Sequence, residues 1–254
     1  MILTSKNNPL IKATASLKEK KGRKELGSFL VEGVKMATEC IRSGFAVEYV
    51  FVEENHTFIP QEVGFAQEQI VYVSKDVMRY LSDEKTPQGV VCRVKLPQKA
   101  LQKPTGSCLL LDGVADPGNV GAIIRSANAA GYNEIYLVEG CADPYAPKSV
   151  RASMSGIFFT KLYFGSREEI LSTLSDAPIV VADMDGENAF TFSPPEVFAL
   201  AIGNEANGIS ALVQNAAAHT VKIPMQATQE SLNAAVSAGI LMYLLKSNYF
   251  TCQK

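Results

Sequence analysis

Four short apolar runs in the second half of the chain constrain its fold more than any other feature. They are SCLLLDG, EIYLV, APIVVADM and VFALAIG, and helical segments separate them. Strands that are apolar along their whole length are typical of a parallel sheet with helices on both faces. The alternation therefore predicts an α/β domain. From these runs alone we expect an unknotted, doubly wound sheet, since knots are almost absent among folds.

A polar segment, LPQKALQKPTGS, separates these runs from the first part of the chain. Its two prolines and its glycine indicate a linker, and we place a domain boundary near residue 103. The predicted units are therefore 1–103 and 104–254. In the first unit, the strands FLVEG, VEYVFV, VYV and GVVCRV alternate with helices expected at 34–42 and 75–81, which predicts a small αβ module.

The two units differ in charge. Residues 1–103 carry a net charge of +4 and residues 104–254 one of −6, and the first 24 residues alone carry +6. A basic segment of this kind can attract phosphates, although a lysine-rich helix is more often a solvated face. The residues of this segment that we predict to contact RNA are Lys18, Lys20, Lys21, Arg23 and Lys24.

The remaining composition excludes several classes of protein. Five cysteines are scattered without a C-x-x-C pair, and the two histidines lack metal-ligand spacing, so neither a disulfide framework nor a metal site is expected. No apolar stretch approaches the roughly 20 residues that span a bilayer. We therefore expect a cytoplasmic protein without a metal ion or a membrane anchor.

The stretch DPGNVGAIIRSANAAG, residues 116–131, lies between two of the predicted strands. It predicts a loop and then a helix from about Val120 to Gly131. A dinucleotide site is one alternative, because Glu139 follows at the distance of a ribose-binding acid. The G-x-G of such sites is absent, however, since the loop has only Gly118 and Gly121. This spacing argues against a nicotinamide enzyme.

An arginine stands on the polar face of this helix. Helical spacing puts Gly121, Arg125 and Asn128 on one side, and a stripe of small and polar residues around one arginine suggests contact with an anion. Taken alone, this motif leaves an ordinary surface or salt-bridged arginine as an open alternative.

Two further segments could form a site with it. The strand VFALAIG leads into a loop at 203–210, at the carboxyl end of a parallel strand, where α/β proteins usually bind ligands. In VKIPMQATQESLNAAVSAGILMYLL, we expect Ser231 or Thr228 to cap a helix. That helix is apolar on nearly all sides from Leu232 to Leu245, so we expect it to be buried all round, in a core or at a subunit interface.

In combination, these motifs resemble the SpoU (TrmH) group of SPOUT RNA ribose 2'-O-methyltransferases. The resemblance rests on N-V-G-A-I-I-R at 119–125, GNEANGIS at 203–210 and IPMQATQESLNAAVSAGILMY at 223–243, in this order. GSFLVEGVK at 27–35 is similar to the substrate-binding domain of that family, an αβ module like a ribosomal protein. The resemblance covers nearly the whole chain.

The resemblance implies a trefoil-knotted α/β domain that binds S-adenosylmethionine in the knot, and a homodimer. It implies the catalytic or supporting residues Arg125, Glu205, Asn119 and Asn233, and the cofactor-binding residues Gly203, Ile223, Met225, Ser231 and Leu232. Because an arginine is a poor base, we expect Arg125 to bind phosphate and stabilise charge, and Glu205 or water to assist proton loss.

The expected activity is methylation of a ribose 2'-hydroxyl in RNA. We favour ribosomal RNA because the first unit resembles that of the large-subunit rRNA enzymes. Transfer RNA as the substrate, a non-catalytic RNA-binding protein and a nucleotide-dependent oxidoreductase are the alternatives.

Overall fold

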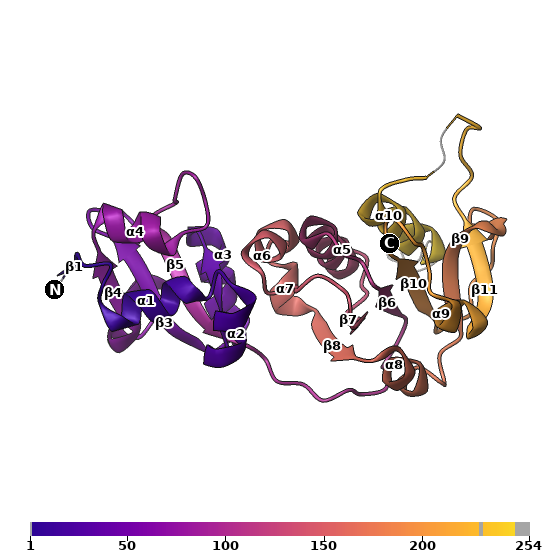
Figure 1. Ribbon diagram of the computed structural model, residues 1–254, viewed down its shortest axis with the longest axis horizontal. Coiled ribbons are helices and arrows are strands. Elements are labelled where there is room, and N and C mark those ends of the chain that lie inside the picture. Colours follow the sequence, from indigo (N-terminus) through magenta and orange to yellow (C-terminus); the bar gives the residue numbers. More distant parts are fainter. Residues whose placement is uncertain (1, 229–230, 247–254) are drawn as a thin grey trace. The chain divides into compact units, whose positions relative to one another are not determined.

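The computed structural model describes residues 2–228 and 231–246 (Figure 1). The chain forms two compact units, one made of Met1–Gln98 with Asp143–Phe158 and the other of Lys99–Ala142 with Phe159–Lys254. This division differs from the predicted continuous one at residue 103, because residues 143–158 pack with the first unit. Among the described residues, no helix has the length and apolar character needed to cross a membrane.

The first unit is built on a five-stranded mixed sheet. Its strand order is β1-β4-β3-β5-β2, and β5 runs antiparallel to both of its neighbours. The strands are β1 (Ile2–Leu3), β2 (Ser28–Glu32), β3 (Val47–Glu53), β4 (Ile70–Val73) and β5 (Val90–Lys95). The helices are α1 (Pro9–Ser16), α2 (Lys20–Leu26), α3 (Val34–Arg42) and α4 (Lys75–Leu81), with short 3-10 turns at Pro60–Val63 and Gln67–Gln69.

Local signals explain where these helices begin. Asn8 caps α1 by accepting a hydrogen bond from the backbone N–H of Leu10, and Ser74 caps α4 in the same way. The inner faces of both helices bury apolar side chains such as Ile11 and Met78 against the sheet. The predicted strands and the helices at 34–42 and 75–81 are confirmed.

Ion pairs link residues 143–158 to the rest of the first unit. This segment forms α6 (Pro147–Ser153) and the start of α7 (Gly156–Phe159). Arg23 makes a buried ion pair with Asp143, with 2.7 Å between Nη2 and Oδ2. Arg151 pairs with Asp83 at 2.9 Å and with Glu84 at 3.0 Å. The partners lie far apart in sequence, so no local pattern could have predicted them.

The second unit contains a six-stranded sheet in which every neighbouring pair is parallel. The strand order is β11-β9-β10-β6-β7-β8. The strands are β6 (Cys108–Asp112), β7 (Glu134–Val138), β8 (Lys161–Gly165), β9 (Ile179–Asn188), β10 (Ala199–Gly203) and β11 (Ala217–Lys222). The helices are α5 (Pro117–Ala129), α8 (Arg167–Thr173), α9 (Ala211–Asn215) and α10 (Ala234–Leu245). The predicted parallel α/β domain is confirmed, and the trefoil knot stays a prediction.

The structure corrects the expected starts of two helices. α5 begins at Pro117 rather than near Val120, because Asp116 accepts a hydrogen bond from the Asn119 N–H and proline suits the first helical position. α10 is capped neither by Ser231 nor by Thr228. Asn233 caps it, accepting from two backbone N–H groups of the first turn.

Within the single chain the last helix is buried on one side only, so its burial in a core is not complete, and burial of the other side at a subunit interface stays a prediction. One side of α10 packs against α5 and β10 and buries Ala238, Leu241, Met242 and Leu245. The opposite side leaves Val236 50% and Tyr243 46% exposed. Within the single chain, one face of this apolar helix, which carries Val236 and Tyr243, is therefore exposed. We call it the open face of α10.

Candidate functional site

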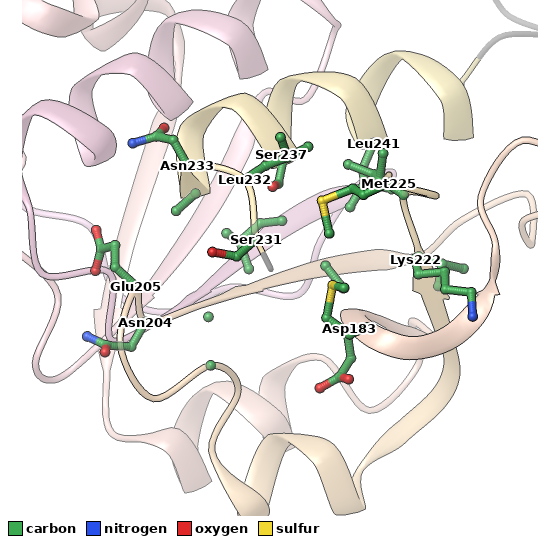
Figure 2. A pocket seen from close by; sticks show the side chains of 18 residues that line it. Asp183, Asn204, Glu205, Lys222, Met225, Ser231, Leu232, Asn233, Ser237 and Leu241 are labelled. Atoms are coloured by element: carbon green, nitrogen blue, oxygen red, sulfur yellow. The ribbon is translucent and has the colours of Figure 1, made fainter. Parts of the chain in front are cut away.

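A cavity of about 430 Å³ lies in the second unit, where the middle of β9 and the ends of β10 and β11 meet α10 (Figure 2). Figure 2 shows Asn204 and Glu205 at one end of the cavity and Asp183 and Lys222 at the other. Its lining is mixed: apolar side chains such as Ile202, Met225 and Leu241 stand beside polar and charged ones. This combination is typical of small-molecule sites.

All five residues expected to bind a cofactor line this cavity. They are Gly203, Ile223, Met225, Ser231 and Leu232, and Glu205 and Asn233 line it with them. Asp183, Met184 and Lys222 also line it, and the sequence reasoning missed them. Lys222 is the last residue of β11, so the rule that indicated the loop at 203–210 could have found it, whereas Asp183 and Met184 lie in the middle of β9.

Backbone and side-chain hydrogen bonds hold the loop that follows β10. The backbone groups of Asn204 and Gly208 exchange two hydrogen bonds of 2.9 Å, and the Asn204 side chain donates to the Gly113 carbonyl at 2.8 Å. A Cβ atom on Gly203 would lie 2.4 Å from the carbonyl carbon of Gly208. Only glycine fits at position 203, so the loop has one tight, predefined shape.

A buried carboxylate anchors the far end of this loop. The side chain of Asp112, the last residue of β6, is 0% exposed. One oxygen accepts a hydrogen bond from the Ser210 N–H at 2.7 Å, and the other pairs with Nε of Arg167 at 2.7 Å. The last residue of β6 therefore joins the N-cap residue of α9 to the first residue of α8.

A hydrogen-bonded polar network joins the three segments that carry the sequence motifs. Asn233 donates from Nδ2 to Oδ1 of Asn119 at 3.0 Å, and Asn119 donates from Nδ2 to Oε1 of Glu205 at 2.8 Å. Because Oδ1 of Asn233 already caps α10, its amide nitrogen must be the donor, and this fixes the orientation of both amides. The predicted residues Asn119, Glu205 and Asn233 are thus brought together.

Glu205 is the acceptor in this network. It takes further hydrogen bonds from the backbone N–H groups of Ala115, at 3.0 Å, and Asp116, at 3.3 Å. Burial acts to raise the pKa of this carboxyl, but these bonds and the one from Asn119 outweigh it and lower the pKa below its usual value. Glu205 is therefore an ionised acceptor and a weak base.

Arg125 lies on the exposed side of α5 and does not line the cavity. Gly121, on the predicted shared face, is buried. Within residues 2–228 and 231–246, the Arg125 guanidinium makes no hydrogen bond or ion pair. The described residues therefore do not support the alternative of a salt-bridged Arg125. Its guanidinium is available to bind an anion.

The residues predicted to contact RNA divide into two groups. Arg23 is only 4% exposed, and its guanidinium bonds to Asp143 and to the carbonyls of Leu17 and Lys18. The charge of Arg23 is therefore used inside the first unit, and this geometry gives no support to its predicted contact with RNA. Lys18 has one structural role, since its ammonium group donates to the Tyr80 carbonyl at 2.7 Å. The exposed residues are Lys20, Lys21 and Lys24.

Two other findings bear on the alternatives. Glu139, on which a nicotinamide site would depend, is exposed just after β7 and does not line the cavity. Among the described residues, no group of three or more histidine, cysteine, aspartate or glutamate side chains could hold a metal ion.

Comparison with known proteins decides the family. Residues 106–243 match the SpoU rRNA Methylase family, and residues 8–92 match the MRM3-like substrate binding domain. The chain belongs to the SpoU rRNA Methylase family. The resemblance drawn from the three motifs is therefore confirmed.

Relatives of this family match the chain along almost its whole length. The 23S rRNA (guanosine(2553)-2'-O)-methyltransferase RlmP of Bacillus subtilis is 29% identical, over 96% of this chain and 98% of its own. A crystal structure of an RNA 2'-O ribose methyltransferase is 31% identical with a TM-score of 0.84, covering 98% of this chain and 100% of its own. An AdoMet-bound rRNA methyltransferase from Sinorhizobium meliloti is 27% identical with a TM-score of 0.89, covering 98% of each chain. Both units of this SpoU protein thus have the architecture of these enzymes.

Proposed function

We propose that this SpoU protein transfers a methyl group from S-adenosylmethionine to a ribose 2'-hydroxyl of ribosomal RNA. One observation carries the proposal: the cavity that holds the five expected cofactor positions lies directly beside the Asn119–Glu205–Asn233 network. A cofactor site and a polar site for a second substrate are what a group transfer between two molecules requires.

The cavity fits this cofactor in size and in chemistry. Its volume of about 430 Å³ falls within the range of roughly 300–1,000 Å³ that is usual for small-molecule sites. Apolar side chains such as Ile223, Leu232 and Leu241 suit an adenine ring, and the charged side chains of Asp183 and Lys222 suit polar groups. S-adenosylmethionine supplies an electrophilic methyl group when bound.

The residues of the polar network would then prepare the RNA side of the reaction. Asn119 and Asn233 hold their amides in one orientation, and Glu205 fixes Asn119 to the loop before α5. Because the pKa of Glu205 is lowered, this carboxylate suits positioning better than proton removal. In our proposal Glu205 is a positioning residue, and the 2'-hydroxyl proton passes to water.

Arg125 would contact the RNA backbone. Its guanidinium is exposed, is always charged and has no partner among the described residues, so it can bind a phosphate beside the reacting ribose. In that position it would stabilise the negative charge that develops on the 2'-oxygen. Support for this role comes from its place on α5, the helix that also carries Asn119.

Ribosomal RNA is the proposed substrate class rather than transfer RNA. RlmP acts on 23S rRNA and matches this chain through both units, and residues 8–92 match an MRM3-like substrate binding domain. We propose that the first unit docks the RNA, with its exposed lysines contacting phosphates.

We also propose that the protein is a homodimer. The open face of α10 carries Val236 and Tyr243, and apolar side chains that gather on one exposed helix face favour burial against another chain. Leu241 and Met242 are buried within the single chain, so charge placed there would damage the fold itself. Val236 is the better position for a test.

The test is methyl transfer to defined RNA. Purified protein is mixed with S-adenosylmethionine carrying a labelled methyl group and with unmodified transcripts of 23S rRNA, 16S rRNA or transfer RNA. We expect label in 23S rRNA, recovered after digestion as a 2'-O-methylated nucleoside. Label in transfer RNA alone, or on a base, would contradict the proposed substrate or the proposed position. Cofactor binding without transfer to any RNA would refute the activity.

A further inference from the structure

One aromatic side chain is exposed in the first unit. Within residues 2–98 and 143–158, Tyr80 is the most exposed aromatic residue, with 37% of its surface accessible. It is the second-last residue of α4, whose other side buries Val77, Met78 and Leu81 in the core. Core packing therefore explains the apolar residues of this helix but leaves the Tyr80 ring unexplained.

Two lysine side chains lie beside this ring. The ammonium group of Lys18 lies 5.5 Å from the ring centroid, and that of Lys6 lies 6.0 Å from it. Lys18 is held there by hydrogen bonds to the carbonyls of Tyr80, at 2.7 Å, and Ser82, at 3.3 Å. Lys6 is exposed. These distances are within the range of cation–π attraction, so the ring is fixed beside two cations.

The positive charge continues along α2. Two residues after Lys18 this helix begins, and it exposes Lys20, Lys21 and Lys24. Lys21 has a partner in Glu25, but the contact is 3.8 Å long and both side chains are mostly in solvent, so it is worth little. Among the described residues, the ammonium groups of Lys20 and Lys24 make no hydrogen bond or ion pair. These three charges can therefore turn to an anionic partner.

An exposed ring next to such charges matches the chemistry of single-stranded nucleic acid. Unpaired bases stack on aromatic side chains, and cationic side chains follow the phosphates. A duplex does not offer the face of a base to a side chain, since its bases are already stacked on one another. The combination of ring and lysines therefore favours an unpaired segment over a helix.

We propose that Tyr80 is a stacking platform for an unpaired base of the RNA substrate, with Lys6, Lys20, Lys21 and Lys24 contacting the flanking phosphates. This inference rests on the proposed function, because it takes RNA as the substrate. It adds that a loop, bulge or strand end is the feature that the first unit recognises, and it names the side chain that does so.

The experiment compares Tyr80→Ala with Tyr80→Phe in the full-length protein. Binding of a fluorescent 12-nucleotide oligouridine is measured by anisotropy, with a duplex of the same length as a second probe. Losing one stacked base costs about 5- to 150-fold in affinity, so we expect Tyr80→Ala to weaken oligouridine binding by a factor in this range. Tyr80→Phe keeps the ring and should bind nearly as well as the wild type.

A matched control separates stacking from a general loss of apolar surface. Ile59 is 50% exposed in the same unit, and Ile59→Ala should leave oligouridine binding unchanged. Circular dichroism checks that each variant is folded. The inference is overturned if Tyr80→Ala binds oligouridine as tightly as the wild type, if Tyr80→Phe loses as much as Tyr80→Ala, or if the duplex binds better than the single strand.

The same variants distinguish this inference from the proposed function. If the wild type methylates 23S rRNA and Tyr80→Ala does so with an unchanged KM, the activity stands and the stacking platform is refuted. If the wild type methylates no RNA but Tyr80→Ala still weakens oligouridine binding, the proposed function fails and the platform stands. If Tyr80→Ala raises the KM for 23S rRNA and leaves kcat unchanged, both the proposed function and the stacking platform are supported.

Discussion

Replacing Arg23 by methionine removes a buried charge while keeping most of the apolar volume of the side chain. The guanidinium makes four hydrogen bonds: Nε and Nη2 donate to Oδ2 of Asp143 at 2.9 and 2.7 Å, and Nη1 donates to the carbonyls of Leu17 and Lys18, each at 2.9 Å. The variant leaves the carboxylate of Asp143 without its counter-charge and deprives both carbonyls of a donor.

The expected loss of stability is large. Breaking a buried ion pair from one side typically costs about 3–5 kcal/mol, because the remaining charge stays desolvated. The Asp143 side chain is 22% exposed, so water can reach part of it, and we expect the lower end, about 3 kcal/mol. The loss should persist in 1 M salt, because a buried pair is screened much less than a surface pair.

Urea unfolding followed by circular dichroism measures this loss. Hydrogen exchange shows where the structure is destabilised, because Arg23→Met should speed amide exchange in both α2 and α6. The neighbouring variant Lys24→Met is the control: Lys24 is exposed, and its removal should change the free energy of unfolding by less than about 0.5 kcal/mol. In the double variant Arg23→Met with Asp143→Asn, the unpaired charge is gone, so part of the stability should return.

For RNA binding the order is reversed: we expect an effect from Lys24→Met and none from Arg23→Met. Lys24→Met should reduce the slope of log affinity against log salt by about 0.7, the value for one phosphate contact to a single strand. Arg23→Met should leave the slope unchanged in the folded protein. The reasoning is refuted if Arg23→Met costs less than about 1 kcal/mol, or if it lowers the salt slope as Lys24→Met does.

Three further predictions concern the second unit. Asn119→Asp replaces the donor that lies 2.8 Å from Glu205 with a second carboxylate, and should cost about 1 kcal/mol at pH 7. The pKa of Glu205 is lowered in the folded wild type, so the stability that this shift contributes is present above the unfolded pKa and is lost as the pH falls through the folded one. The difference in the free energy of unfolding between the wild type and the variant should therefore shrink as the pH falls below 4.5, the ordinary pKa of this carboxyl, and an equal difference at pH 7 and well below pH 4.5 would contradict this. Val236→Glu should give monomers in sedimentation, because it places a charge on the proposed dimer interface. Leu212→Glu, at an exposed position on α9, is the control and should leave the oligomeric state of the wild type unchanged. A wild type that is monomeric at micromolar concentration would refute the proposed dimer. Arg125→Ala should slow single-turnover methyl transfer by roughly a hundredfold with unchanged cofactor binding, and Arg125→Lys should recover part of the rate if charge alone matters; near-normal turnover in the alanine variant would leave the arginine without a catalytic role.

Much of the fold could be predicted because its signals are local. The helices at 34–42 and 75–81 have the predicted bounds, and the apolar runs of the second half form β6, β7, β9 and β10. Strand and helix periodicities depend on neighbouring residues in the chain, and the carboxyl ends of parallel strands gather at one edge. The same rule predicted that the loop after β10 would line a ligand site.

Some local signals were present in the sequence but do not by themselves decide where a helix begins. Asp116 and Pro117 form an N-cap and a first helical residue, yet the helix was expected to begin at Val120. Asn233 is as good a cap as Ser231, and only the course of the chain decides between them. The open face of α10 could not be predicted, because an all-apolar helix has no period that points to its buried side.

The sequence by itself determined the element types, the parallel sheet, the three motif segments and, through their order, the SpoU family. Only the tertiary structure decided which charges are used inside the protein and which remain for a partner. Arg23 and Lys24 are adjacent and look alike in sequence, but Arg23 meets a carboxylate 120 residues away. Asn119 likewise meets Glu205 across 86 residues and Asn233 across 114. Contacts at such separations depend on how whole elements pack, and the local preferences of the chain contain no information about them.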